Sequence, residues 1–381
     1  MYIERILKKI DPEIEAILQK GLDLKPISCS DAALLFDVKN SELFSLLRVS
    51  NYAAESIHRS ISTYIVNLNI NFTNICKNSC SFCSFRKGET DIGAYTLAID
   101  HILEKIDSKM KYGLSEVCIQ GALNPSLNFS YIESMISRIS EQFPTLHIHA
   151  LSPMEIHYYA EKDNLTVEEV LRRAIDAGLG SICGTAAEVL DDSIRKKICP
   201  DKIDTDTWCT IIKKAHSLGL SSTATILYGY HDSSTARVAH MQKIKEIQRE
   251  SKKFTEFIPL RYIPNSEKIK DVTLDLKMHA ISRLFFLNSI QNIQVSYVKL
   301  SPALSAYILF CGANDLGGTL FEEHITSSAR MLPSYTLSEP QIIDVIYSVG
   351  RTPYRRDTLY SHQDEVYFES DSCLKKARTR C

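Results

Sequence analysis

The chain has 381 residues, of which 44% are hydrophobic and 24% are charged, and its formal net charge is −2. This length suffices for one large α/β barrel domain with additional segments at its ends. The balanced charge and the lack of a polybasic tract argue against nucleic acid or an anionic membrane as a partner. No apolar run is long enough to cross a bilayer and residues 1–18 carry charges throughout, so we expect a soluble, cytoplasmic protein.

Residues 1–58 are expected to form a helical cap, because apolar side chains recur there at helical spacing. From residue 59 onward, strand-like and helix-like segments alternate. The expected strands are 64–70, 116–121, 146–151, 179–184, 222–228, 256–260 and 293–300. The expected helices are 96–109, 132–139, 166–178, 188–198, 206–219, 234–250 and 273–289. The stretch 319–381 is expected to be a mainly helical extension.

This alternation favours parallel βαβ units. The number of units indicates an α/β fold of the (β/α) barrel or partial barrel type over residues 59–318, with helical extensions at both ends. A doubly wound sheet gives the same order of elements and stays as the alternative. In a barrel the functional residues follow the carboxyl ends of the strands, so the residues after each predicted strand are the candidates for a site.

Three of the eleven cysteines lie close together after the first predicted barrel strand, at Cys76, Cys80 and Cys83. Thiolates are the ligands that iron–sulfur clusters use, and three on one loop leave the fourth iron of a 4Fe–4S cluster open. Structural zinc normally takes four protein ligands, and no second Cys-x2-Cys pair is present, so zinc is the weaker alternative. The other cysteines are expected to be small buried hydrophobic residues.

The spacing Cys-x3-Cys-x2-Cys, with Phe82 before the last cysteine, resembles the signature of the radical S-adenosylmethionine (SAM) superfamily. The resemblance implies a 4Fe–4S cluster on the three cysteines, SAM as cofactor and Phe82 near its adenine. From about residue 15 to 365 the chain is similar to the 5-amino-6-(D-ribitylamino)uracil–L-tyrosine 4-hydroxyphenyl transferases. The similar blocks are NINFTNIC at 69–76, HALSPMEI at 149–156, GTAAEVLDDSIRKKICPDK at 184–202, AHSLGL at 215–220, FTEFIPL at 254–260, GANDLGGTLFEE at 312–323 and RTPYRRDTLY at 351–360.

That family implies an enzyme that cleaves L-tyrosine between Cα and Cβ and joins the 4-hydroxybenzyl fragment to 5-amino-6-(D-ribitylamino)uracil, in FO and coenzyme F420 biosynthesis. It also implies an electron donor and a second radical SAM subunit that closes the deazaflavin ring. The chain departs from the family pattern at 121–125, 230–232 and 251–253. The alternatives are a futalosine-pathway (menaquinone) radical SAM synthase, a diverged paralogue with another substrate, and an iron–sulfur electron carrier.

Four residues are candidates for binding SAM. Gln120 and Gly121 end a strand where superfamily members hydrogen-bond the SAM amino group through the backbone, and a simple turn is the alternative. Glu188 and Arg195 are expected on one helix face, where a carboxylate suits ribose hydroxyls or an ammonium group and a guanidinium suits the SAM carboxylate. A charge in the first helical turn and a surface ion pair are the ordinary alternatives.

Further candidates follow the strands ending at 151 and 228. Ser152 and Glu155 suit SAM or the tyrosine amino group. The pattern Ser-Pro-x-Glu is also typical of a helix start, so capping is the favoured role of Ser152. Tyr230 and His231 follow the fifth predicted strand, where the family resemblance places a histidine in the site.

The last candidates lie in a glycine-rich segment near the C-terminus. Asn314 and Asp315 have the donors and acceptors to read the edge of the uracil ring. A tight turn stabilised by Asn or Asp is the competing interpretation. The arginines at 351, 355 and 356 are expected on a solvated surface.

Overall fold

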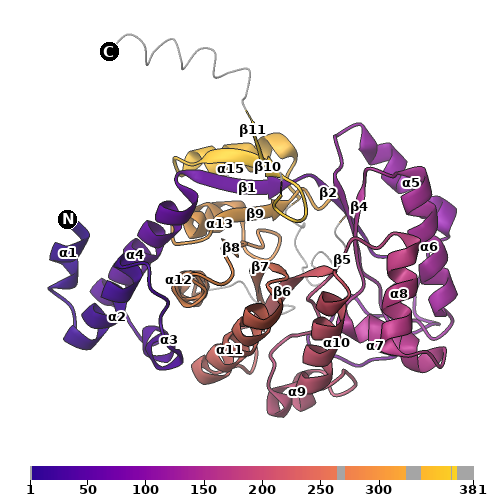
Figure 1. Cartoon of the computed structure of the whole chain (residues 1–381), viewed down its shortest axis with the longest axis horizontal. Coiled ribbons are helices and arrows are strands. Elements are labelled where there is room, and N and C mark those ends of the chain that lie inside the picture. Colours follow the sequence, from indigo (N-terminus) through magenta and orange to yellow (C-terminus); the bar gives the residue numbers. More distant parts are fainter. Residues whose placement is uncertain (1, 264–270, 323–335, 362, 367–381) are drawn as a thin grey trace, which may run out of the picture.

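The computed structural model of the chain describes residues 2–263, 271–322, 336–361 and 363–366. Seven parallel strands form one curled sheet in the order β2-β3-β4-β5-β6-β7-β8, so each strand lies beside its successor in the sequence. Helices lie outside this sheet (Figure 1). This is the arrangement of a (β/α) barrel, and it confirms the predicted α/β fold.

The strands of the curled sheet are two to eight residues long. They are β2 (Asn67–Ile70), β3 (Glu116–Ile119), β4 (His147–Ala150), β5 (Ser181–Ile182), β6 (Ser221–Tyr228), β7 (Phe254–Arg261) and β8 (Asn292–Ile293). The helices between them are α5 (Ile99–Met110), α6 (Phe129–Gln142), α7 (Pro153–Lys162), α8 (Val167–Ala177), α9 (Asp192–Ile198), α10 (Thr205–Ser217), α11 (Ser234–Ser251) and α12 (Thr273–Phe285). The strand expected at 293–300 ends at Ile293.

A second sheet of four strands has the order β11-β10-β1-β9. Its strands are β1 (Ile61–Ile65), β9 (Asp315–Gly318), β10 (Thr352–Arg356) and β11 (Gln363–Glu365). β1 is parallel to both β9 and β10, and β11 is antiparallel to β10. The single strand expected at 64–70 is therefore two strands, which separate at Val66 and enter different sheets.

The stretch around β9 links the two edges of the curled sheet. Gln294, directly after β8, pairs in parallel with Asp315, and Leu68 of β2 pairs in parallel with Phe321. The last strand and the first strand of the curled sheet are thus both joined to the segment 315–321. This closure positions the residues of β9 and β10 beside the interior of the barrel.

Helical segments flank the barrel at both ends of the chain. The N-terminal ones are α1 (Tyr2–Leu7), α2 (Pro12–Leu22), α3 (Cys29–Leu35) and α4 (Asn40–His58), and α4 packs against α2 and α12. The C-terminal ones are α13 (Pro302–Leu309) and α15 (Glu339–Ser348). The sequence analysis did not predict strand β10, and the helical segments expected within 323–335 and 367–381 lie outside the described residues.

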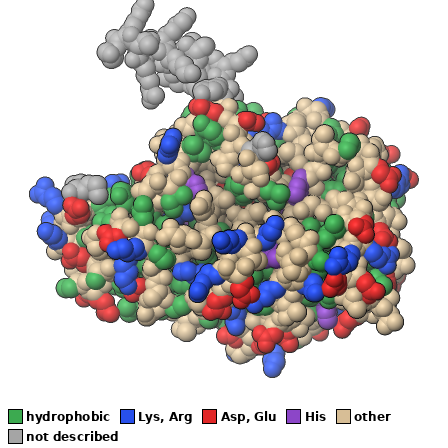
Figure 2. Space-filling view, in the orientation of Figure 1, with side chains coloured by type: hydrophobic (Ala, Val, Ile, Leu, Met, Phe, Trp, Pro, Cys, Tyr) green, Lys and Arg blue, Asp and Glu red, His purple; other side chains and the backbone are tan. Residues whose placement is uncertain are grey.

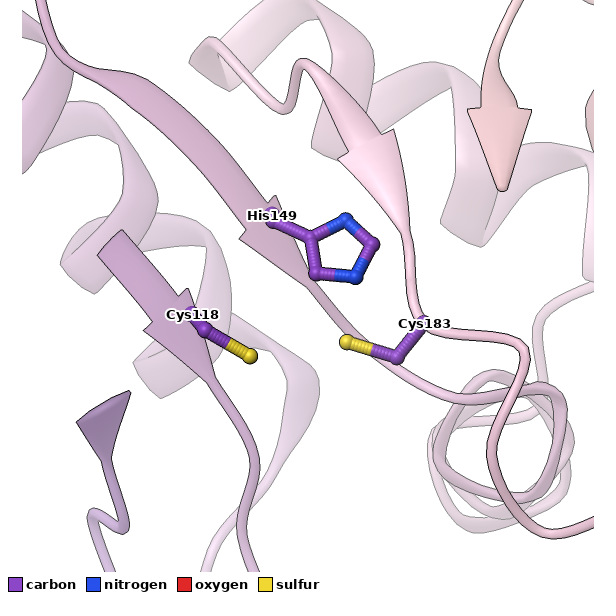
Figure 3. A group of neighbouring side chains, drawn as sticks. All are labelled: Cys118, His149 and Cys183. Atoms are coloured by element: carbon purple, nitrogen blue, oxygen red, sulfur yellow. The ribbon is translucent and has the colours of Figure 1, made fainter. Parts of the chain in front are cut away.

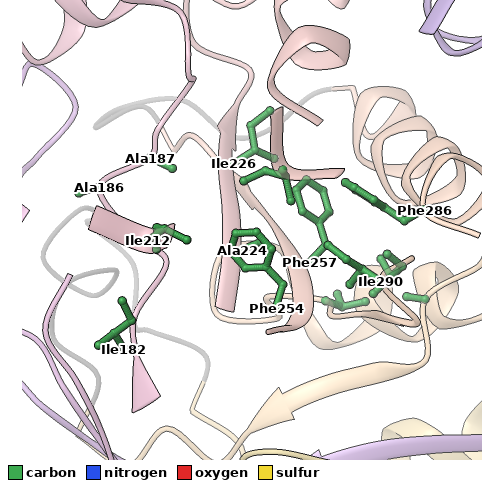
Figure 4. Packing of buried hydrophobic residues seen from close by; sticks show 14 of the residues in the cluster. Ile182, Ala186, Ala187, Ile212, Ala224, Ile226, Phe254, Phe257, Phe286 and Ile290 are labelled. Atoms are coloured by element: carbon green, nitrogen blue, oxygen red, sulfur yellow. The ribbon is translucent and has the colours of Figure 1, made fainter. Parts of the chain in front are cut away.

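Side-chain alternation along β6 and β7 separates the core from the interior. Ala224 and Ile226 of β6 belong to the hydrophobic core (Figure 4). Phe257 of β7 packs there on Phe286, with ring centroids 4.7 Å apart. The residues between these positions face the other way, into the barrel, where they are available for a site.

The surface carries both signs of charge. On the face drawn in Figure 2, Lys and Arg side chains alternate with Asp and Glu side chains rather than gathering by sign. Among the described residues, no helix combines the length and the apolar character that a membrane crossing requires.

Gly184 lies where the chain leaves β5 and passes β6. A Cβ at this position would lie 1.8 Å from the backbone oxygen of Thr223. Two hydrogen bonds hold the close approach: the Gly184 N–H donates to Thr223 Oγ1 and Thr225 Oγ1 donates to the Gly184 carbonyl, each over 2.8 Å. Because a neighbouring backbone fills the space of a side chain, only glycine fits here.

We expect Gly184→Ala to lower the free energy of unfolding by more than about 2 kcal/mol, because the backbone of β6 must shift. Gly350→Ala is the control: its φ is +72° but no atom lies within 4 Å of the new Cβ. The left-handed conformation alone costs about 1 kcal/mol. Denaturant unfolding of the two apoproteins measures the difference, and equal losses would contradict a steric origin.

Candidate active site

A cavity of about 380 Å³ lies inside the barrel. Inward-facing residues of successive strands line it, together with the cysteine loop after β2. From β3 these are Glu116, Cys118 and Gln120, which alternate with core residues as the pleat requires. The carboxyl ends of the parallel strands form the mouth beside the cysteine loop, and their amino ends form the floor.

All three clustered cysteines, Cys76, Cys80 and Cys83, line this cavity. Their loop is tied to the segment after α9: the Ser81 N–H donates to the Ile198 carbonyl over 2.8 Å. Ser79 donates to Asp201 Oδ2 from its N–H (2.7 Å) and from its Oγ (2.6 Å). The loop is therefore held against the barrel by contacts far apart in sequence.

The cysteine loop fits an iron–sulfur cluster. Three thiols on one loop open into one cavity, which is the soft donor set such clusters use. Asn78, between the first two cysteines, is 2% exposed and lines the cavity, yet neither its Oδ1 nor its Nδ2 has a hydrogen-bond partner. Burial raises the pKa of the free Cys80 thiol to about 12. Unpartnered polar atoms and an apolar thiol site are what a bound group would satisfy.

Phe82 and Glu188 also line the cavity, and Lys202 joins them. Lys202 Nζ lies 2.5 Å from Glu188 Oε1 and 5.4 Å from the centre of the Phe82 ring. Burial alone would lower the pKa of Lys202, but the Glu188 carboxylate raises it above the ordinary value. The lysine thus remains charged beside the cysteine loop, and the sequence analysis did not single it out.

The expectation that Glu188 and Arg195 share a helix face is wrong. Helix α9 begins only at Asp192, and Glu188 lies before it with a φ of +45°. Arg195 is 3% exposed and does not line the cavity. Its guanidinium donates to backbone carbonyls, those of Ala186, Ala187 and Ile203. These bonds make Arg195 a structural tie of the segment beneath the cysteine loop.

Ser152 and Glu155 line the cavity and form the capping box of α7. The Ser152 N–H and Oγ both donate to Glu155 Oε2 over 2.7 Å. The other oxygen, Oε1, accepts from the Gly121 N–H over 3.1 Å. Burial raises the pKa of Glu155, and these hydrogen bonds oppose that rise. The carboxyl group therefore joins the end of β3 to the start of α7, and the capping role of Ser152 is confirmed.

Gly121 and Gln120 line the cavity at the end of β3. The close approach at Gly121 is made by a side chain of this chain: a Cβ there would lie 2.1 Å from Cζ of Phe72. The backbone carbonyl of Gln120 accepts from Asn71 Nδ2 over 3.0 Å, and the side-chain Nε2 of Gln120 lies 3.6 Å from Cys118 Sγ. The contact of this turn with SAM stays a prediction.

Tyr230 and His231 do not line the cavity. The Tyr230 hydroxyl donates to Ser81 Oγ over 3.1 Å, and its ring stacks on Tyr262 with centroids 4.0 Å apart. Tyr262 itself lines the cavity. His231 is exposed, with a φ of +59°. Tyr230 therefore supports the cysteine loop from outside, and the imidazole faces away from the cavity.

The structure does not bring Asn314 and Asp315 into the cavity wall. Asn314 is 1% exposed and its Oδ1 accepts from Arg283 Nη2 (2.6 Å) and from the Ile293 N–H (2.9 Å). Asp315 is fully buried and pairs with Arg356, Nε to Oδ2, over 2.5 Å. Both side chains are occupied by the fold, so the expectation that they read the uracil edge is wrong.

The arginines expected on the surface are largely inside. Arg356 is 5% exposed and lines the cavity, and Arg351 is 3% exposed. Arg355 is half-buried. The expectation fails because β10 inserts beside β1, which the composition of this stretch did not reveal. Pro353 within this stretch argues against a strand, so no local signal in the sequence predicted β10.

Two carboxylates of the floor were missed in the sequence. Glu116 and Glu256 are 6% and 4% exposed, and both line the cavity near Arg356. Burial raises the pKa of Glu116, but His149, the hydrogen bond from Asn67 and the charge of Arg356 lower it. The net result is a pKa below the ordinary value. Burial raises the pKa of Glu256 to about 8 against the charge of Arg356. A carboxylate within a buried strand is the sequence signal that would have found them.

Cys118, His149 and Cys183 form a second group of soft side chains, on or directly after β3, β4 and β5 (Figure 3). One ligand atom of each lies within 4.8 Å of the others, and all three residues are buried. Burial lowers the pKa of His149 to about 4, and its Nδ1 is 2.7 Å from Ser181 Oγ.

Of the remaining scattered cysteines, Cys199 and Cys311 are buried and Cys209 is half-buried. Cys29 was expected to be buried but is exposed, and Cys373 and Cys381 lie outside the described residues.

The Cys-x3-Cys-x2-Cys loop opens into the cavity of a (β/α) barrel at the carboxyl ends of its strands. This arrangement defines a radical SAM enzyme. Residues 70–244 match the radical SAM superfamily, and residues 251–368 match the CofH/MqnC C-terminal region. Two solved structures agree in fold. They are the FeFe-hydrogenase maturase HydG from Carboxydothermus hydrogenoformans (TM-score 0.74, 16% identity, 94% of this chain and 83% of that one) and methylornithine synthase PylB (0.71, 17%, 88% and 97%).

Curated relatives define the family more narrowly. The 5-amino-6-(D-ribitylamino)uracil–L-tyrosine 4-hydroxyphenyl transferase of Methanothermobacter thermautotrophicus is 41% identical over 94% of this chain and 100% of its own. The protein of that name from Methanocaldococcus jannaschii is 43% identical over 88% of this chain and 97% of its own. The chain therefore belongs to the family of 5-amino-6-(D-ribitylamino)uracil–L-tyrosine 4-hydroxyphenyl transferases.

The buried Glu256 predicts a dependence of stability on pH. Between its ordinary pKa of 4.5 and about 8, the folded protein holds a proton on Glu256 that the unfolded chain has lost. Stability from this group therefore falls as pH rises through that window, by up to about 1.4 kcal/mol per pH unit. Glu256→Gln removes the titration.

The parent apoprotein should lose the contribution of Glu256 to its free energy of unfolding from about pH 5 to about pH 8, and Glu256→Gln should not. We therefore expect the free energy of unfolding of Glu256→Gln to rise relative to that of the parent across this window. Arg356, Asp315 and Glu116 face the same carboxyl group and stay unchanged in the comparison. Denaturant titrations at several pH values measure the difference. A constant difference across the window would contradict a raised pKa at Glu256.

Proposed function

We propose that this chain transfers the 4-hydroxybenzyl fragment of L-tyrosine to 5-amino-6-(D-ribitylamino)uracil, breaking the tyrosine Cα–Cβ bond. The observation that carries the proposal is the similarity to transferases of this name along their whole length, with the cysteine loop opening into the barrel cavity. The reaction belongs to the formation of FO, the precursor of coenzyme F420.

Cys76, Cys80 and Cys83 would hold a 4Fe–4S cluster with SAM beside it. When bound, this pair supplies the radical chemistry that removes a hydrogen atom from tyrosine. Phe82, Gln120, Gly121 and Glu188 line the same part of the cavity and are the residues available to SAM. Lys202, held charged by Glu188, lies beside the loop and favours negative charge on it.

The residues above the floor exclude water from the reactants. Leu227, Ile258, Leu260 and Val298 line the cavity as apolar side chains. A dry wall prevents a reactive organic fragment from being quenched before it meets the pyrimidine. Glu155 contributes by positioning, because its two oxygens fix the Gly121 turn relative to α7.

The proposal includes three features of the cellular context. An electron donor is needed, and a second radical SAM subunit closes the deazaflavin ring, because this chain carries a single Cys-x3-Cys-x2-Cys motif. We place the reaction in the cytoplasm.

The proposed division of the chain into domains is a helical cap at 1–58, the barrel at 59–318 and a C-terminal extension at 319–381.

The function is tested by reconstituting and reducing the enzyme without oxygen. SAM, L-tyrosine and 5-amino-6-(D-ribitylamino)uracil are then added, and the coupled product is sought by mass spectrometry. We expect the adduct together with 5′-deoxyadenosine. Formation of 5′-deoxyadenosine without adduct would reject the substrate assignment, and aminodeoxyfutalosine-type substrates would then be offered in place of the pair.

The cluster assignment predicts opposite behaviour for two neighbouring cysteines. Cys80→Ala should lose cluster iron and all product, because one of three ligands is gone. Cys199 packs in the same small buried group as Cys80 but does not line the cavity. Cys199→Ala should keep its iron and its activity within about twofold, as expected for a packing residue.

Iron content, the visible absorption spectrum and SAM cleavage measure both variants. Loss of the cluster in Cys199→Ala would make Cys199 a fourth protein ligand. That result would favour an electron carrier, since four thiolates leave no open iron for SAM.

A further inference from the structure

A buried oxygen atom at the floor of the cavity has no partner in the described protein. Glu256 is 4% exposed and lines the cavity, and its Oε2 makes no hydrogen bond. Leaving a buried polar group without a hydrogen bond costs about 1–3 kcal/mol. Native folds satisfy such atoms with ordered water or with a ligand, and because this one lies in a cavity wall it is a place at which a polar ligand can bind.

The charges around Glu256 select the kind of ligand. The positive charge of Arg356 is already matched by Asp315, with Nε and Oδ2 2.5 Å apart. His149 is neutral near pH 7, because burial lowers its pKa to about 4. Among the described residues, the floor thus has no unmatched cation for a carboxylate or a phosphate. It offers the carboxyl groups of Glu116 and Glu256, which suit a neutral group with several hydroxyls that both donate and accept hydrogen bonds.

The position of the floor selects which part of a substrate reaches it. Glu256 and Leu260 face the cavity from the same strand, four residues apart, as do Glu116 and Gln120. That spacing corresponds to about 13 Å along a strand. Reacting atoms must lie near the cysteine loop at the mouth, so the floor receives a substituent that extends away from the reacting ring.

We propose that the floor of the barrel, formed by Glu116, Glu256 and Asn67, which is level with Glu116 on the neighbouring strand, binds the ribityl chain of the pyrimidine substrate. The ribityl chain is a neutral polyol whose hydroxyls both donate and accept hydrogen bonds. It extends from the ring position next to the carbon that accepts the fragment, and Glu256 Oε2 forms a hydrogen bond with one of its hydroxyls. This inference rests on the proposed function and adds where that substrate is held.

Asn67 supports this arrangement through its own contacts. Its Nδ2 donates to Glu116 Oε1 over 2.9 Å, and the residue lines the cavity. The amide therefore fixes one oxygen of Glu116 and leaves the carboxylate oriented within the floor. L-Tyrosine competes as a chemical alternative, because its phenol is a neutral donor, but it offers one hydroxyl where the floor offers two carboxyl groups.

The test compares two ligands and two variants in equilibrium binding. The ligands are 5-amino-6-(D-ribitylamino)uracil and the analogue whose substituent is an n-pentylamino chain without hydroxyls. Glu256→Met removes the hydrogen-bonding oxygens at nearly constant shape, and Glu256→Gln keeps both a donor and an acceptor at this position. Dissociation constants are measured by anaerobic equilibrium dialysis with the reconstituted protein, and thermal unfolding checks that each variant is folded.

We expect the parent enzyme to bind the ribityl compound at least about tenfold more tightly than the pentyl analogue, as lost buried hydrogen bonds require. Glu256→Met should weaken the ribityl compound about tenfold and the pentyl analogue less than about twofold. Glu256→Gln should stay within about threefold of the parent for both, and the KM for L-tyrosine should be unchanged in both variants.

Three outcomes overturn the inference. They are equal binding of both ligands by the parent, equal weakening of both ligands in Glu256→Met, and unchanged binding of both ligands in Glu256→Met. A rise in the KM for L-tyrosine in Glu256→Met, with ribityl binding unchanged, assigns the floor to the phenol. If the parent enzyme binds no pyrimidine and forms no adduct, the proposed function fails together with the inference. If the parent forms the adduct but one of the three outcomes above is found, the inference alone fails.

Discussion

The buried ion pair between Asp315 and Arg356 is the interaction on which the closed barrel and its cavity depend. It joins β9 to β10 across β1, and Thr63 of β1 adds a hydroxyl donor to Asp315 over 2.6 Å. Two buried charges of opposite sign need each other, because removing one partner leaves the other uncompensated at a cost of about 3–5 kcal/mol. The pair therefore holds the C-terminal strand at the floor, where Arg356 also acts on the carboxyl groups of Glu116 and Glu256.

A second set of contacts holds the mouth. The loop with the cysteines is tied to the segment from Ile198 to Lys202 through Ser81, Ser79 and Phe82. Arg195 fixes the backbone on either side of α9 by donating to the carbonyls of Ala186, Ala187 and Ile203. The mouth and the floor are thus organised independently: one by backbone carbonyls around α9, the other by charge around β9 and β10. Substitutions at one end of the cavity are expected to leave the other in place.

Much of the barrel was predictable because it follows from periodicity, whereas the chemistry at its floor was not. The alternation of strands and helices from 64 to 293 is local, and so is the Ser-Pro-x-Glu start of α7. The cysteine spacing is equally local and identified the superfamily. Side chains such as Arg356 depend on which strand lies beside which, and a parallel partner 291 residues away leaves no trace in the sequence near it. Asn314 and Asp315 were misassigned for the same reason, since their partners Arg283 and Arg356 are remote.

The parallel pairing of β1 with β10 has a consequence for the order in which the molecule is made. β1 is synthesised early and β10 late, because their paired residues run from Ile61 with Thr352 to Tyr64 with Arg355. β1 therefore lacks this neighbour until residue 356 has been synthesised. Such a distant pairing forms slowly, because a long loop must close first. The charged floor is therefore assembled last, and a nascent chain that already carries its cysteine loop does not yet have a complete chamber for substrate.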